Sequence, residues 1–162
     1  MEERKEVIQK GINVPQPVFS YDTPINNAMA RLAKTPPVPN MFDVKTHGTD
    51  TFVEFFRQDY PEGDRRGKID AFTLSCILKG RSDYKAFVAD CKSRNVKPTV
   101  RLLSCSTGNT TNTGNCFAQL LASELGHNVV APTDILYAHH DGSFHIGDFA
   151  DGEMKTFYSR KN

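Results

Sequence analysis

Residues 99–108 read TVRLLSCSTG, and this stretch decides the fold. It begins with an almost continuous apolar run, which is typical of a strand that is buried on both faces of a parallel sheet. The run ends at Cys105, where small residues follow. Residues 42–48, FDVKTHG, alternate apolar and polar side chains as a half-buried strand does, and they reach His47. Because open α/β sheets place their sites at the carboxyl ends of the strands, we expect His47 and Cys105 at one edge of the sheet.

The chemistry expected at this edge is that of an activated thiol. An imidazole within hydrogen-bond reach holds a cysteine as thiolate or takes its proton, and the sulfur then becomes a nucleophile. We therefore predict Cys105 as the nucleophile, with a lowered pKa, and His47 as its base. Backbone N–H groups for an oxyanion hole and for substrate contact are expected at Gly48, Ser106, Thr107 and Gly108.

The rest of the pattern predicts an α/β domain with a mainly parallel sheet flanked by helices and a C-terminal hairpin. Proline-rich stretches separate residues 1–40, which we interpret as a linker with one packed helix over 22–34, from a single domain over 41–162. Periodicity and cap residues predict helices over 51–58, 69–80, 83–95 and 116–126, a charged loop over 61–68, strands over 127–133 and 154–160, and a hairpin over 135–148.

Composition excludes several classes of protein. The formal net charge of +1 and the lack of a basic stripe argue against a nucleic-acid partner. No apolar run is long enough to span a membrane, and residues 1–11 lack the apolar core of a signal peptide. The four cysteines form no CxxC pair and no zinc-type cluster, so we expect reduced thiols, with Cys76 in the core and Cys91 partly buried on a helix. We expect no metal and no organic cofactor.

The strand ends resemble those of the caspase-like (clan CD) cysteine peptidases, including the CHAT proteases, in which a His-Gly ends one strand and a Cys ends the next. The succession VRLLSCSTG, FAQLLASELG and VVAPTDILY is similar, more closely, to the C-terminal toxin domains of bacterial polymorphic toxins. This resemblance covers roughly residues 41–146. It implies a caspase-like fold and a toxin-type effector.

What the resemblance implies for function is cleavage of a protein substrate by the His47–Cys105 dyad. Asp43 and Asp134 are expected to orient the base or to line a substrate pocket. A cognate immunity protein is an expected partner, and neither nucleic acid nor membrane is. A domain of this type would be delivered into a target cell as part of a larger secreted toxin and would act in the cytosol.

A second thiol gives a rival interpretation. Cys116 opens a predicted helix, whose N-terminus lowers a thiol pKa through its partial positive charge. The order Cys…His…Asp fits papain-like hydrolases and deamidases. The base would be a downstream histidine and the orienting group a carboxylate, chosen from His139, His140 and His145, with Asp148.

Two further alternatives belong to other classes. Residues 46–56, THGTDTFVEFF, resemble the first motif of diphtheria-toxin-like ADP-ribosyltransferases, in which His47 would bind the nicotinamide ribose of NAD. That interpretation also needs a tyrosine such as Tyr137 and a late glutamate, for which Glu153 is the one available. The last alternative is an inactive caspase-like fold that binds a protein, because a fold does not determine a function.

Overall fold

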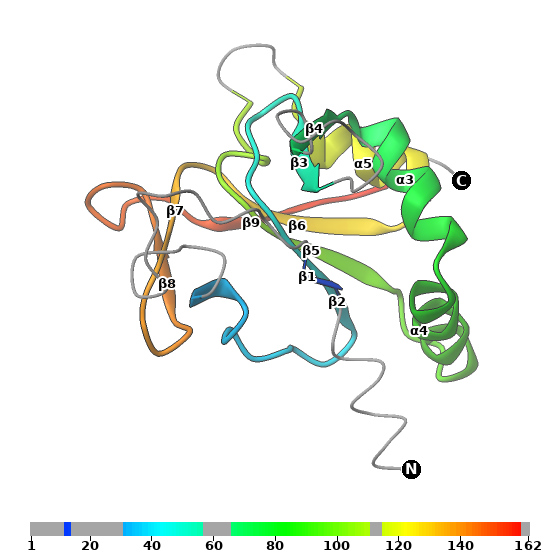
Figure 1. Cartoon of the computed structure of the whole chain (residues 1–162). Helices are drawn as coiled ribbons and strands as arrows, with labels where there is room; N and C mark the ends of the chain where they lie inside the picture. The colour runs from blue at the N-terminus through cyan, green and yellow to red at the C-terminus, as the bar shows by residue number, and fades with distance from the viewer. Residues whose placement is uncertain (1–11, 14–30, 57–65, 111–114, 160–162) are drawn as a thin grey trace.

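The computed structural model describes residues 12–13, 31–56, 66–110 and 115–159. Its centre is a five-stranded sheet in the order β1-β2-β5-β6-β9 (Figure 1). Strands β1 to β6 of this sheet pair in parallel, and β9 pairs antiparallel with β6 at the edge. The five strands are β1 (Ile12–Asn13), β2 (Met41–Lys45), β5 (Thr99–Leu103), β6 (Asn128–Pro132) and β9 (Met154–Phe157).

Three helices cover one face of the sheet. They are α3 (Ala71–Gly80), α4 (Ser82–Ser93) and α5 (Phe117–Leu125). Because side chains alternate along a strand, one set of strand residues faces these helices and forms the main core with them. That set includes Phe42, Val44, Val100, Leu102 and Val129, all of which are fully buried.

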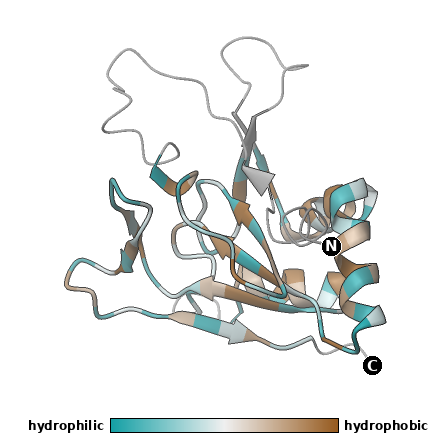
Figure 2. Ribbon diagram, turned by 90° about the horizontal axis from the view of Figure 1, so that it is seen from below, coloured by the Kyte–Doolittle hydropathy of each residue, from teal (hydrophilic) through white to brown (hydrophobic). Residues whose placement is uncertain are grey.

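The other face carries a smaller cluster. Here Leu103 packs with Leu32, Leu136, Ala138 and Ile146. The last three come from a hairpin of β7 (Leu136–Ala138) and β8 (Phe144–Ile146), which lies at the opposite end of the molecule from the helices in Figure 1. Apolar residues gather in the central strands and in the helices beside them (Figure 2).

These observations confirm a mixed α/β fold with a mostly parallel sheet flanked by helices, and also the C-terminal hairpin. The predicted helix over 51–58 is wrong. Strand β3 (Val53–Phe56) lies there and pairs antiparallel with β4 (Arg66–Ile69), part of which falls in the predicted loop over 61–68. A short run of phenylalanines fits a strand as well as a helix, and the pairing with β4 decides between them.

The segment before residue 41 is folded where the structure describes it. Arg31 and Leu32 are helical, in agreement with the end of the helix predicted over 22–34, and the rest of that prediction lies outside the described residues. Leu32 and Thr35 are buried against the remainder of the domain. Residues 32 and 35 are therefore part of the packed structure.

Candidate functional site

The strand register brings the main chains of His47 and Cys105 together. Strands β2 and β5 are neighbours, and Lys45 pairs with Leu103 in their last rung. His47 and Cys105 each follow two residues later, beyond the carboxyl end of its strand. The amide of Thr46 still donates to the carbonyl of Leu103 at 3.2 Å, so the two segments stay side by side after the strands end.

A second contact lies just beyond His47 and Cys105, between Gly48 and Thr107. A Cβ built at Gly48 would lie 3.0 Å from Cγ2 of Thr107, so the His-Gly turn touches the loop after Cys105. The bond from Thr46 and the contact at Gly48 thus bracket His47 and Cys105. Because this position follows from main-chain register, it holds whichever rotamers the two side chains adopt.

Cys105 faces the smaller apolar cluster, on the sheet face opposite the helices. Its thiol donates weakly to the carbonyl of Leu136, with Sγ and O 3.8 Å apart. Burial raises the pKa of Cys105, and the Asp134 carboxylate acts in the same direction. The expected lowering of this pKa is therefore wrong for this conformation, because the thiol lies against apolar groups and a carboxylate. Cys105 is a neutral thiol at neutral pH and needs a base to become a nucleophile.

The loop after Cys105 is held by its own backbone. The amide of Ser106 donates to the carbonyl of Asp134 at 3.0 Å, and that of Gly108 donates to Pro132 at 2.8 Å. Thr107 is fully buried, and its hydroxyl is 2.9 Å from that of Ser104. Two of the four predicted oxyanion donors are thus already engaged.

Gly48 is differently placed. Its bridge to Val53 is flanked by bonds from Thr49 to Phe52 and from Glu54 to His47, so the bridge itself uses neither amide. Within the described ranges, no hydrogen bond engages the amide of Gly48 or that of Cys105. These two N–H groups meet one requirement for oxyanion donors, namely that no other group in the described ranges uses them.

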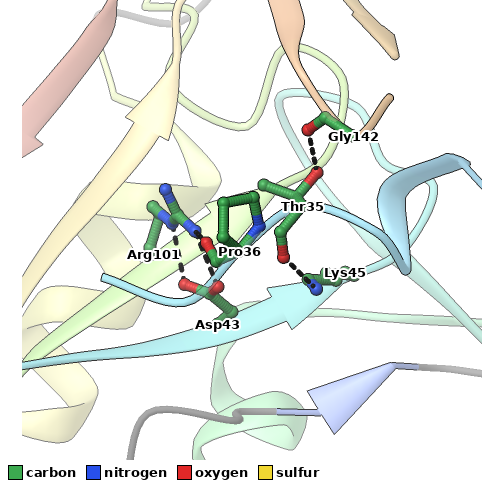
Figure 3. Close-up of polar contacts among 6 residues, drawn as sticks. All are labelled: Thr35, Pro36, Asp43, Lys45, Arg101 and Gly142. Carbon is green, nitrogen blue, oxygen red and sulfur yellow. Dashed lines mark hydrogen bonds and ion pairs between the residues drawn. The ribbon is translucent and has the colours of Figure 1, made fainter. Parts of the chain in front are cut away.

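Asp43 does not orient the base. Its carboxylate is fully buried and receives two hydrogen bonds of 2.7 Å from Arg101 on β5 (Figure 3). His47 follows four residues later, which is about 13 Å along an extended chain. Asp43 is therefore part of a buried ion pair beneath residues 35 and 36.

Asp134 lies closer to the thiol. Its carbonyl fixes the amide of Ser106, and its charge is one cause of the raised pKa of Cys105. On the neighbouring hairpin, the hydroxyl of Tyr137 donates to Asp148, which raises the pKa of Tyr137. Asp134 is therefore close enough to Cys105 to act on the electrostatics of its thiol.

The rival thiol lies elsewhere. Cys116 is the N-cap residue of α5 and is only 1% exposed. It belongs to the main core, which lies between the sheet and the helices. Burial raises its pKa and outweighs the amides of Ala118 and Gln119, which lower it. His145 and Asp148 belong to the hairpin region beside the smaller cluster on the other face. The structure does not bring them together with Cys116.

The hairpin histidines form a small cluster of their own. His139 Nε2 and His145 Nδ1 are 2.8 Å apart, and His145 stacks on Tyr137. His140 is exposed. Across the described ranges, no group of three or more His, Cys, Asp or Glu side chains is arranged to hold a metal ion. Glu153 is also exposed, and its amide bonds the hydroxyl of Thr133.

The other predicted thiol positions need one correction. Cys91 is fully buried on α4, and burial raises its pKa. Cys76, expected in the core, is exposed on α3. The apolar run AFTLSCILKG is wider than the face that α3 buries, so Cys76 and Phe72 on its other side are exposed to solvent.

Sequence reasoning missed the network around Asp43. Lys45 Nζ donates to the carbonyl of Thr35 at 3.0 Å, and Arg101 donates to that of Pro36 at the same distance (Figure 3). Burial lowers the pKa of Lys45, and Asp43 opposes this effect. The sequence does contain an indication of this buried network. Charged residues stand at alternate positions of two strands that are otherwise mainly apolar, namely Asp43, Lys45 and Arg101.

Comparison with known proteins gives one positive result. A family model described as "Domain of unknown function (DUF8616)" matches residues 17–146, which is most of the chain. No curated protein matches the sequence significantly. None of the helices in the described ranges is both long and apolar enough to cross a bilayer.

Proposed function

The chain belongs to the family described as a domain of unknown function (DUF8616), and we propose that it is a cysteine-peptidase-type hydrolase that acts as a toxin effector. Cys105 is the nucleophile and His47 the base. The observation that carries the proposal is the placement of these residues side by side, beyond the ends of β2 and β5.

The proposed reaction starts from a neutral thiol. As the Cys105 sulfur attacks the carbonyl carbon of a peptide bond, its proton passes to His47, and the carbonyl oxygen becomes an oxyanion near the amides of Gly48 and Cys105. The C–N bond then breaks, and the leaving amine takes the proton from His47. Water, deprotonated by His47, hydrolyses the thioester and regenerates the thiol. The raised pKa of Cys105 makes the base necessary.

The biological setting follows from the resemblance of the Cys105 segment to polymorphic toxin domains. The substrate is a protein of the target cell, the domain arrives there as part of a larger secreted protein, and it acts in the cytosol. A cognate immunity protein protects the producing cell. The chemistry needs no metal and no organic cofactor.

The test uses single variants and two readouts. Four proteins are compared: wild type, Cys105→Ala, His47→Ala and the matched control Cys116→Ala. Each is expressed in the bacterial cytosol while growth is followed, and each purified protein is incubated with unfolded casein to measure cleavage. We expect growth arrest and cleavage with wild type and Cys116→Ala, and neither with the other two. Full activity in a folded Cys105→Ala protein would exclude this nucleophile.

One observation favours a second candidate function. The Cys105 thiol lies in an apolar cluster and its pKa is raised, which is the environment of an inert structural cysteine. A non-catalytic binding module would have this property. It predicts that Cys105→Ala and wild type behave alike in both assays.

A further inference from the structure

Residues 31–38 form a strap across the sheet face that carries Cys105. Side chains of the strap donate to carbonyls at alternate positions of the β7–β8 connection. The three bonds run from Arg31 Nη1 to Ala138 at 3.3 Å, from Lys34 Nζ to His140 at 3.2 Å, and from Thr35 Oγ1 to Gly142 at 2.8 Å. The strap therefore follows the hairpin from β7 to its tip.

The sheet holds the strap from the other side. Lys45 of β2 and Arg101 of β5 donate to the strap carbonyls of Thr35 and Pro36 (Figure 3). Both cations are buried, and these carbonyls satisfy donors that would otherwise be costly to remove from water. Lys45 is two residues before His47, so this anchor lies next to the proposed site.

An apolar contact completes the cover. Leu32 of the strap is 4% exposed and belongs to the same cluster as Leu103 and Leu136. Cys105 packs against this cluster, and its thiol meets the Leu136 carbonyl. Leu32 of the strap and Cys105 therefore pack against the same cluster.

We propose that the strap is an autoinhibitory cover, which restricts access to the Cys105 thiol until it is displaced. Displacement removes Leu32 from the cluster and gives solvent and substrate fuller access to Cys105, which is only partly exposed in the structure. The biological role of this step rests on the proposed function, whereas the covering itself does not depend on catalysis.

The experiment measures the rate at which iodoacetamide labels each cysteine in the folded protein, mapped by peptide mass analysis. Thr35→Val keeps the shape of the side chain but leaves the Gly142 carbonyl without its partner. Gly142→Ala adds a Cβ that collides with the backbone of Lys34 and pushes the strap from the hairpin tip. The matched control is Ser75→Ala, which removes a buried hydroxyl bond to Phe72 on the helical side.

We expect Cys105 labelling to rise about tenfold in Thr35→Val, the change that corresponds to losing one buried hydrogen bond. It should also rise in Gly142→Ala, in which the added Cβ displaces the strap. Labelling of the fully buried Cys91 reports global unfolding and should not change. Equal rises at Cys91 and Cys105, an equal rise in Ser75→Ala, or no rise at Cys105 would each overturn the proposal. If Cys105 labelling responds but neither the wild type nor the two variants with a displaced strap cleave casein, the strap proposal stands and the proposed function fails.

Discussion

Asp43→Asn is the substitution whose effect on stability follows most directly from the structure. The new side chain has the same shape but no charge, so the buried Arg101 guanidinium loses its countercharge while it stays in the interior. The side chain of Arg101 is 10% exposed and that of Asp43 is fully buried. Breaking a buried ion pair on one side costs about 3–5 kcal/mol, because an uncompensated charge remains.

The neighbouring Lys45 adds to this loss. Asp43 opposes the effect of burial on the pKa of Lys45, so removing the carboxylate lowers that pKa further. We therefore expect the free energy of unfolding to fall by at least about 3 kcal/mol, which corresponds to about 6–12 °C in Tm for a domain of this size. The double variant Asp43→Leu/Arg101→Met should recover the part of the loss that comes from Arg101, since that charge is removed together with its partner, whereas Lys45 still lacks the Asp43 carboxylate.

The assay is urea unfolding followed by far-ultraviolet circular dichroism, because the chain has no tryptophan. Asp83→Asn is the control. It breaks the pair with Arg81, whose side chains are 41% and 29% exposed, and exposed pairs contribute at most about 1 kcal/mol. If Asp43→Asn costs no more than Asp83→Asn, or if the double variant is as unstable as the single one, the reasoning is refuted.

Two other predictions concern packing and pH. Gly108→Ala should destabilise the fold by about 1–3 kcal/mol, because its Cβ would lie 2.9 Å from the carbonyl oxygens of both Ala131 and Pro132. The control Gly80→Ala should not destabilise the fold, because no atom lies within 4 Å of its Cβ. Equal melting temperatures of the two variants would contradict this prediction. Burial, helped by Lys79, lowers the pKa of His127, whose Nδ1 is 2.8 Å from the hydroxyl of Tyr84. The unfolded state therefore binds more protons below about pH 6.5, and stability should fall as the pH drops through that range. His127→Gln should lose this acid-dependent part in unfolding titrations, and an unchanged pH slope would show that His127 is not its source.

The parts of the fold that were predictable depend on local pattern. The apolar run of β5, the alternation in β2 and the glycine at the end of α5 each encode one element without help from the rest of the chain. In the structure β2 and β5 are neighbours and pair in parallel up to Lys45 and Leu103, two residues before His47 and Cys105. Strand β3 was not predictable in this way, because its identity depends on pairing with β4.

The environment of the site was less accessible from sequence. A cysteine at a strand end suggests a reactive thiol, but its pKa depends on burial and on Asp134, which is distant in the chain. For the same reason the sequence allowed Asp43 to be predicted as an orienting residue. The structure shows that its carboxylate instead binds Arg101, which is 58 residues away in the chain. Long-range contacts of this kind decide the electrostatics, and one sequence does not contain them.

Covalent trapping with an irreversible inhibitor tests whether Cys105 is a nucleophile activated by His47. Wild type, His47→Ala and Cys116→Ala proteins are incubated with peptidyl acyloxymethyl ketones that differ in the residue next to the reactive group, and the modified residue is mapped by mass analysis. We expect an adduct on Cys105 in wild type and Cys116→Ala that is lost in folded His47→Ala protein, because the neutral thiol needs its base. An adduct on Cys116, or one on Cys105 that forms equally fast without His47, would contradict it.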